Sequence, residues 1–451
     1  MIPIYYSEDT ICAMATAPGG AIAIIRVSGA DAVGLCTPLW TGLNGLTIDK
    51  QPPRYMTLGE FHSADGIIDP SCIAVKMVAP HSYTGENVVE FQCHGGAVCA
   101  RAVLRAILSA GARLAEPGEF SKRAFLNGRM DLTQAEAISD MITAGSDTAL
   151  KLAGMQLQGA IGRKIAELED ALNALRAEIE SRMDFPEEDL DWRPKDDLLA
   201  TLQSTADELD RLAATRDAGE LLRGGASLVI AGPPNVGKSS LLNRMLGRDR
   251  AIVSDIPGTT RDTVEASVQI NGIPFHLIDT AGIRSDNGDS IELAGMERSK
   301  EAAAIADLVL WVTDASKPLS GQEWPNWDIS GKLLHVANKA DLLKSAVPQD
   351  GALLISAMEG SGMQELYDAM EAAVLNGHRE TDDIAVSARH ADLLSQAATS
   401  VREAIPLCET ETWELCTVPL SQAIFSLGQI SGKTALPDVL DNIFSKFCIG
   451  K

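Results

Sequence analysis

Residues 232–239 have the sequence GPPNVGKS, a glycine-rich spacing that can wrap the phosphates of a nucleotide. The segment follows an apolar run at 227–231 and precedes an apolar helical pattern, the strand–loop–helix setting that this chemistry needs. Backbone N–H groups of the loop and of the helix N-terminus would face the phosphates. Lys238 would act catalytically by neutralising the β- and γ-phosphates, and the Ser239 hydroxyl would bind Mg²⁺. The contacts expected here are Asn235, Val236, Gly237, Lys238, Ser239 and Ser240.

A second motif selects the base. The sequence NKAD, with Asn338, Lys339 and Asp341, follows an apolar run at 333–337. The Asp341 carboxylate can accept hydrogen bonds from the N1 and N2 donors of guanine, which adenine lacks. A buried acceptor left unpaired against adenine would cost on the order of a few kcal/mol, so the motif predicts GTP rather than ATP. Ser356 and Ala357 are expected to close the base pocket.

Two further motifs lie between the phosphate loop and NKAD, in the order expected of a GTPase. Asp279, in the sequence DTAG, ends an apolar run and would hold Mg²⁺ through water, while the Gly282 N–H group would meet the γ-phosphate. Thr260 is the expected switch threonine on Mg²⁺. These motifs together predict a GTPase with an α/β Ras-like domain. The further nucleotide contacts expected are Ser254, Asp255, Ile256, Pro257, Gly258, Thr259, Thr260, Asp279, Thr280, Ala281 and Gly282.

The residue after DTAG is Ile283, where Ras-like GTPases have a glutamine that orients water. An isoleucine cannot hydrogen-bond water, so the polar group must come from elsewhere. Glu292 is the catalytic candidate, acting directly or through a second water, and an exposed glutamate on a switch segment is the competing interpretation.

Asn235 can turn its oxygen towards the phosphates and help to bind a monovalent cation, with backbone carbonyls of the 254–259 loop. Potassium there would do the electrostatic work of an arginine finger.

The elements that position these motifs change character along the chain. Residues 1–119 have short apolar runs between Gly and Pro turns, which predicts an α+β domain. Residues 120–222 are helical, with an apolar stripe formed by Ile161, Ile165, Leu168, Leu172, Leu175, Ile179 and Met183. Residues 223–378 alternate strands and helices, as a mostly parallel sheet requires, and residues 379–451 are helical again. The pattern predicts a multidomain protein in which the GTPase interrupts an all-α domain.

Composition excludes several classes of protein. The net charge of −24 and pI near 4.7 argue against a surface that grips nucleic acid over its whole extent. The eight cysteines form no CxxC pair, which indicates reduced thiols rather than a disulfide framework or a zinc ribbon. Neither a signal peptide nor a membrane span fits the N-terminal segment, so we expect a cytoplasmic protein without membrane association.

Together the motifs resemble the bacterial tRNA-uridine-modification GTPases of the TrmE/MnmE family, and the resemblance runs the whole length. It is carried by DTICA at 9–13, RVSG at 26–29, YTGE at 83–86, HGG at 94–96, PGEFS at 117–121 and RAFLNG at 123–128. The C-terminal sequence CIGK at 448–451 is like the family's C-terminal signature and is the most specific feature. Pro233, Pro257 and Cys93 replace residues common in the family, but none removes a side-chain ligand.

The resemblance implies that residues 1–119 bind a tetrahydrofolate derivative, 5-formyl- or methylene-tetrahydrofolate, and mediate homodimerisation. It implies a potassium-dependent GTPase and an FAD-containing partner, MnmG (GidA), in a heterotetramer. That assembly would add an aminomethyl or carboxymethylaminomethyl group to C5 of the tRNA wobble uridine. Family positions for folate correspond to Arg26, Glu90, Arg129 and Lys451, and those for K⁺ to Asn235, Ser254, Ile256 and Thr259. Glu292 corresponds to the water-orienting glutamate.

Other functions stay open on the residues alone. A ribosome-assembly or other RNA-associated GTPase shares the same phosphate loop and NKxD motif, but it would need a basic RNA-binding domain after the GTPase. A stand-alone folate enzyme moving one-carbon units would turn folate over without a partner protein. A dynamin-like membrane GTPase would need a basic amphipathic helix. Cys448 is either an activated thiol or simply a terminal one.

Overall fold

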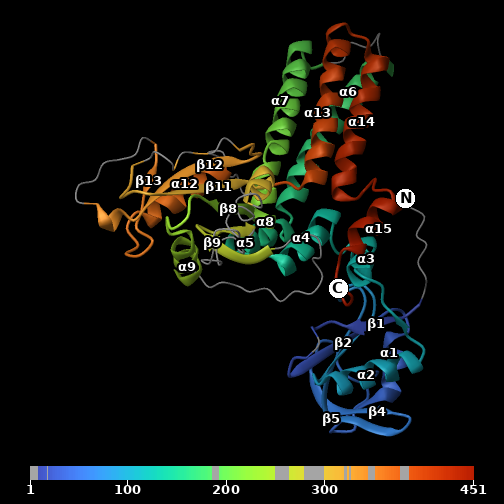
Figure 1. Cartoon of the computed structure of the whole chain (residues 1–451). Coiled ribbons are helices and arrows are strands. Elements are labelled where there is room, and N and C mark those ends of the chain that lie inside the picture. The colour runs from blue at the N-terminus through green and yellow to red at the C-terminus, as the bar shows by residue number, and fades with distance from the viewer. Residues whose placement is uncertain are drawn as a thin grey trace. The chain divides into compact units, whose positions relative to one another are not determined.

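The computed structural model describes residues 9–17, 19–184, 192–248, 264–278, 299–318, 322, 324, 327–343, 351–375 and 385–451. The chain divides into two compact units (Figure 1). The first joins Met1–Ser139 to Gly428–Lys451, and the second is Asp140–Leu427. Among the helices of the described residues, none combines the length and apolarity needed to cross a membrane.

The first unit is built on a seven-stranded sheet of order β3-β4-β5-β6-β2-β1-β7. Neighbouring strands pair antiparallel except β1 and β7, which are parallel. The strands are β1 Ile11–Met14, β2 Ile22–Ser28, β3 Trp40–Gly42, β4 Thr57–Ser63, β5 Gly66–Met77, β6 Val88–His94 and β7 Arg113–Leu114. Helices α1 (Ala32–Cys36) and α2 (Ala97–Ser109) share a core with the sheet, in which Ile25, Phe61 and Phe91 are fully buried. This unit is α+β, as predicted.

Chain segments from both ends meet in the same unit. Helices α3 (Glu119–Leu126) and α4 (Leu132–Thr143) follow the sheet, and α15 (Pro437–Ser445) comes near the C-terminus. Leu132, Leu440 and Phe444 pack in one apolar cluster. Gly118, with φ +66°, permits this approach, because a Cβ there would lie 2.4 Å from the Phe444 carbonyl oxygen.

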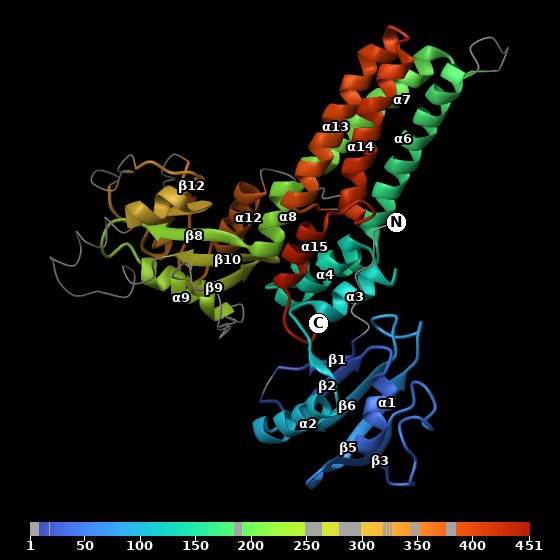
Figure 2. The same cartoon turned by 90° about the vertical axis from the view of Figure 1, so that its right-hand side faces the viewer.

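The second unit contains most of the predicted helices. Figure 2 shows α6 (Ala160–Asp184), α7 (Lys195–Ala213), α13 (Ala388–Glu409) and α14 (Trp413–Ser431) running side by side. The predicted apolar stripe of α6 is buried from Ile161 to Ile179, whereas Met183, near the helix end, is half-buried. The structure describes this helix as far as Asp184. Two shorter helices are α5 (Asp147–Leu157), which precedes α6, and α8 (Arg216–Gly224), which directly precedes the first strand of the second sheet.

The second sheet has six strands in the order β13-β12-β11-β8-β10-β9. All pairs are parallel except β9 with β10, which confirms the predicted mostly parallel sheet. The strands are β8 Ala226–Ala231, β9 Val264–Ile270, β10 Ile273–Ile278, β11 Leu308–Asp314, β12 Lys332–Asn338 and β13 Leu353–Leu354. Helices α9 (Lys238–Arg248) and α12 (Met363–Val374) contribute to its core. The segments that follow β8, β11 and β12 therefore leave the sheet at one edge, where ligands of such folds bind.

Candidate functional site

The phosphate loop joins β8 to α9 at that edge. Gly232 has φ +149°, and a Cβ there would lie 2.1 Å from the Val312 carbonyl oxygen of β11. Gly237 has φ +96°, and its Cβ would lie 2.4 Å from Asn338 Nδ2. Asn235 has φ 61°, a left-handed conformation that asparagine tolerates better than most residues. Both glycines of the GxxxxGKS spacing are thus required by close contacts with β11 and with the base-selecting motif.

Lys238 lies over the loop that it terminates. Its Nζ donates hydrogen bonds to the carbonyl oxygens of Gly232 (2.9 Å) and Pro233 (2.8 Å). The ammonium group is therefore held against the backbone of the loop, and in loops of this kind the lysine contacts the β- and γ-phosphates of the nucleotide.

The base-selecting residues are tied to the phosphate loop by Asn338, which is buried at the end of β12. Its Nδ2 donates to the Val236 carbonyl at 2.9 Å, and its Oδ1 accepts from the Ala357 N–H at 3.0 Å. The Ser356 hydroxyl donates to Asp341 Oδ1 at 2.6 Å. Asp341 is exposed, so a guanine can reach the carboxylate that Ser356 orients. The structure therefore brings together the phosphate loop, NKAD and Ser356–Ala357 residues.

Two further residues, Asp314 and Arg244, organise this site, and the sequence motifs did not predict either of them. Asp314, at the end of β11, is 1% exposed, and its Oδ2 accepts from Lys339 Nζ at 2.8 Å. Lys339 Nζ also donates to the Asn235 carbonyl. Burial opposes ionisation of Asp314, but hydrogen bonds from Lys339 and Ser316 outweigh it and hold its pKa below the ordinary value. Arg244 of α9 donates from Nε to the Ala357 carbonyl at 2.8 Å.

The signal for Asp314 was an acidic residue that ends a strand beginning with five apolar residues, Leu308 to Val312, and that strand pairs with the one that leads into NKAD. The remaining predicted residues lie outside the described residues. They are Ser254, Asp255, Ile256, Pro257, Gly258, Thr259, Thr260, Asp279, Thr280, Ala281, Gly282, Ile283 and Glu292.

A separate constellation lies in the first unit, where Arg26 of β2 faces Glu90 of β6 across the antiparallel pair. Arg26 Nε donates to Glu90 Oε1 at 2.7 Å, and both side chains are mostly buried, 15% and 16% exposed. The Arg26 guanidinium also lies 5.0 Å from the centroid of the Tyr83 ring and 5.5 Å from that of Phe120. Charged hydrogen-bonding groups beside aromatic faces suit a flat, polar heterocycle.

The C-terminal residues reach this constellation. The Gly450 carbonyl accepts from Arg26 Nη1 at 3.4 Å, and Ile449 forms a β-bridge with Pro117. Gly450 has φ +99°, and a Cβ there would lie 2.2 Å from the Met14 carbonyl oxygen. Lys451, the next residue, is half-buried. The structure therefore joins Arg26, Glu90 and the tail that carries Lys451.

Arg129 is exposed, and its Cγ lies beside Gly85 in the loop that also carries Tyr83. Arg123, a residue of the RAFLNG sequence at 123–128, is 5% exposed and organises this loop. It pairs with Glu86 (3.2 Å), Glu119 (3.0 Å) and Asp9 (2.8 Å). These ion pairs connect the 83–86 loop to α3 and to the start of β1.

Comparison with known proteins gives matches over both units. Residues 10–129 match the family model described as "GTP-binding protein TrmE N-terminus", and residues 132–448 match that of the "MnmE helical domain". A protein of Clostridioides difficile named "tRNA modification GTPase MnmE" is 42% identical over 99% of this chain and 100% of its own length. Proteins with the same name from Akkermansia muciniphila (45%; 98% and 99% covered) and Geobacter sulfurreducens (42%; 99% and 100% covered) are similar.

The chain belongs to the MnmE family of GTPases. The MnmE helical-domain match begins at α4 and ends beyond α15, so it encloses the sheet that carries the GTP motifs. The predicted family and multidomain fold class are therefore confirmed, with a GTPase inserted between helical segments.

Proposed function

We propose that this protein is a potassium-dependent GTPase that acts with a partner to modify C5 of the wobble uridine, U34, of tRNA. MnmE family membership supports GTP hydrolysis in tRNA modification, since the full-length relatives are named tRNA modification GTPases. The observation that carries the GTP assignment is the link from Ser356 to Asp341, with Asn338 joining that region to the phosphate loop. These hydrogen bonds support Asp341 as the acceptor for guanine, held beside a phosphate-binding loop.

In this proposal Lys238 and the loop N–H groups hold the phosphates, and Asp341 selects guanine. Mg²⁺ would be held by Ser239 and Thr260, with Asp279 acting through water, and would neutralise charge on the phosphates. Ser239 is the first residue after Lys238 in α9, so the loop geometry suits that role. Glu292 would orient the attacking water; Glu292→Ala with normal GTP binding and unchanged hydrolysis would exclude this.

Potassium would bind at Asn235, with the carbonyls of Ser254, Ile256 and Thr259. Support comes from Asn235, whose left-handed backbone lies within the loop and whose carbonyl is held by Lys339. A cation at this position would stabilise the charge that develops on the phosphates. The test is the GTPase rate in KCl against NaCl for the wild type and Asn235→Ala. Equal rates in both salts for the wild type would contradict the potassium requirement.

A tetrahydrofolate derivative, 5-formyl- or methylene-tetrahydrofolate, would bind at Arg26, Glu90, Arg129 and Lys451. The donor set fits such a ligand, because Glu90 can accept from pterin amino and ring N–H groups and the cations suit an anionic glutamate tail. Tyr83 supplies an aromatic face beside Arg26. The bound group would supply the one-carbon unit. Calorimetric titration with 5-formyl-tetrahydrofolate tests the assignment: we expect Glu90→Gln to weaken binding and Glu60→Gln, a half-buried carboxylate on β4 outside this set, to leave it unchanged.

The proposal includes a homodimer and a heterotetramer with the FAD-containing MnmG (GidA), in the cytoplasm. It keeps the domain division 1–119, 120–222 with 379–451, and 223–378. The first experiment is mass spectrometry of tRNA nucleosides from cells with and without the gene. Loss of a C5-aminomethyl-type wobble uridine, restored by the wild type but not by Lys238→Ala, supports the proposal. Unchanged wobble uridine would favour a ribosome-assembly or other RNA-associated GTPase.

A further inference from the structure

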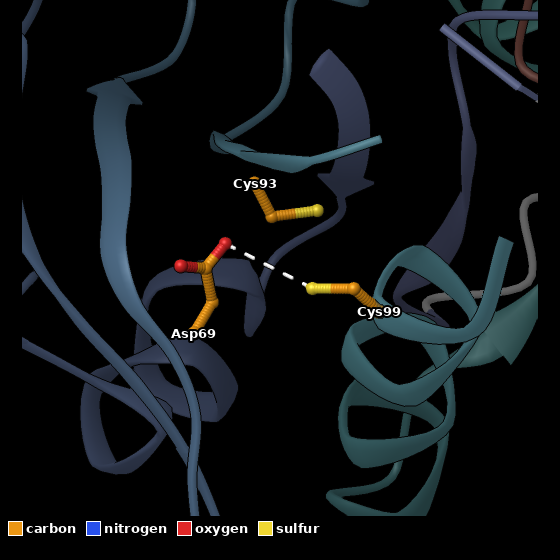
Figure 3. A group of neighbouring side chains, drawn as sticks. All are labelled: Asp69, Cys93 and Cys99. Atoms are coloured by element: carbon orange, nitrogen blue, oxygen red, sulfur yellow. Dashed lines mark hydrogen bonds between the residues drawn. The ribbon is translucent and has the colours of Figure 1, made fainter. Parts of the chain in front are cut away.

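Three side chains in the first unit form a group that the proposed function does not use. Asp69 of β5, Cys93 of β6 and Cys99 of α2 face one another in Figure 3. One possible ligand atom of each, a carboxylate oxygen or a thiol sulfur, lies within 4.8 Å of the other two. These residues come from separate elements, so the fold itself assembles the group.

The group is pre-organised around the Asp69 carboxylate. The Asp69 side chain is fully buried, and Cys93 is 2% exposed. The backbone N–H of Ser71 donates to Asp69 Oδ1 at 2.9 Å, and that of His94 donates to Oδ2 at 2.8 Å. The His94 imidazole Nδ1 lies 3.0 Å from both carboxylate oxygens. Donors from two strands thus fix the carboxylate in one orientation, as the outer contacts of metal ligands do.

The distances are somewhat longer than the edges of a metal site. Cys99 Sγ lies 3.9 Å from Asp69 Oδ2, the contact drawn as a dashed line in Figure 3. With Zn–S near 2.3 Å and Zn–O near 2.0 Å, a tetrahedral site has S–O edges of about 3.5 Å and S–S edges of about 3.8 Å. Cys99 is the only partly exposed member of the group and lies in the first turn of α2. Small side-chain rotations there would bring the three ligand atoms to the distances that a bound cation requires.

We propose that Asp69, Cys93 and Cys99 bind a zinc-type divalent cation, with water at the fourth position. Thiolate ligands select zinc over magnesium or calcium, and one carboxylate completes a three-residue set. The partial exposure of Cys99 provides the route by which the ion and the water reach the site. The bound ion links β5, β6 and α2.

The experiment uses the full-length protein without a histidine tag, purified under reducing conditions. Zinc is measured by elemental mass spectrometry, and protein stripped by a chelator is titrated with Co²⁺ and then Zn²⁺. We expect about one Zn²⁺ per chain. We also expect thiolate-to-cobalt charge-transfer absorption that Zn²⁺ abolishes. Cys99→Ala should remove that absorption, and Asp69→Asn should lower the affinity about tenfold or more.

The matched control is Cys36→Ala, which removes a buried thiol of the hydrophobic core that also contains Cys93 but lies outside the three-residue group. It should retain the metal and the cobalt spectrum. Circular dichroism verifies that Cys99→Ala is folded. The cobalt spectrum of the wild-type protein tests the proposal independently of any variant. Absence of charge-transfer absorption in the wild type, or the same spectrum in folded Cys99→Ala, overturns the proposal. A Cys93–Cys99 disulfide whose reduction produces no metal binding overturns it too.

Discussion

Asp314 shows how a single side chain sets the guanine site, since its buried carboxylate holds Lys339 at 2.8 Å. Asp314→Asn removes the charge but keeps the size, so Lys339 loses its ionic partner while its contact with the Asn235 carbonyl remains. A hydrogen bond to a charged group contributes about 1.5–3 kcal/mol, and because one contact remains we expect GDP affinity to fall about 5- to 30-fold. Titration with a fluorescent GDP analogue measures this. Asp328→Asn, an exposed carboxylate in the same unit, is the control; equal affinities for all three proteins would contradict the role.

Gly237, the second glycine of the phosphate loop, gives another prediction for a single residue. Gly237→Ala would place Cβ 2.4 Å from Asn338 Nδ2 at a φ of +96°, so the loop or Asn338 must move. We expect nucleotide affinity to fall at least tenfold, on the order of 1.4 kcal/mol or more. Gly247→Ala is the matched control, because Gly247 lies in α9 with no heavy atom near its would-be Cβ. That change should leave affinity intact and stabilise the helix by about 0.5–1 kcal/mol.

At the scale of elements, α6 and α7 are joined by Lys164 and Glu208, 2.8 Å apart. The hydrogen bond from Arg211 and the pairing with Lys164 lower the pKa of Glu208 from 4.5 to about 2. A carboxyl whose folded-state pKa is lowered stabilises the fold above its unfolded pKa, and this contribution disappears as the pH falls from 4.5 towards 2. Because the Lys164 and Glu208 side chains remain partly exposed, 29% and 24%, solvent screens the pair and we expect about 0.5–1 kcal/mol. Glu208→Gln should remove that acid dependence in denaturant unfolding followed by circular dichroism. Glu167→Gln, whose side chain is 71% exposed, should retain it.

For the molecule as a whole, sequence patterns predicted the features that depend on residues close together in the chain. The stripe of α6, the parallel strands and the phosphate loop follow from periodicity and glycine spacing within short windows. Contacts between segments far apart in the sequence could not be predicted from these patterns, because strand order and register are set by packing of the complete fold. Asp314 meets Lys339 only because β11 pairs with β12. Asp69 likewise meets Cys93 and Cys99 only through the fold of the first unit.

The closure of the first unit by the C-terminus leads to a prediction for the chain as a whole. Residues 428–451 belong to the same compact unit as residues 9–139, and the Gly450 carbonyl accepts a hydrogen bond from Arg26. Gly450→Ala would place Cβ 2.2 Å from the Met14 carbonyl at a φ of +99°, which displaces the tail from Arg26 and Glu90. Backbone strain of about 1–3 kcal/mol should lower affinity for 5-formyl-tetrahydrofolate about 5- to 150-fold, measured by calorimetry. Gly34→Ala, which meets no atom within 4 Å, is the control. GDP affinity, which depends on residues of the second unit, should stay unchanged in both variants. Equal folate affinity of Gly450→Ala and the wild type would show that the tail takes no part in that site.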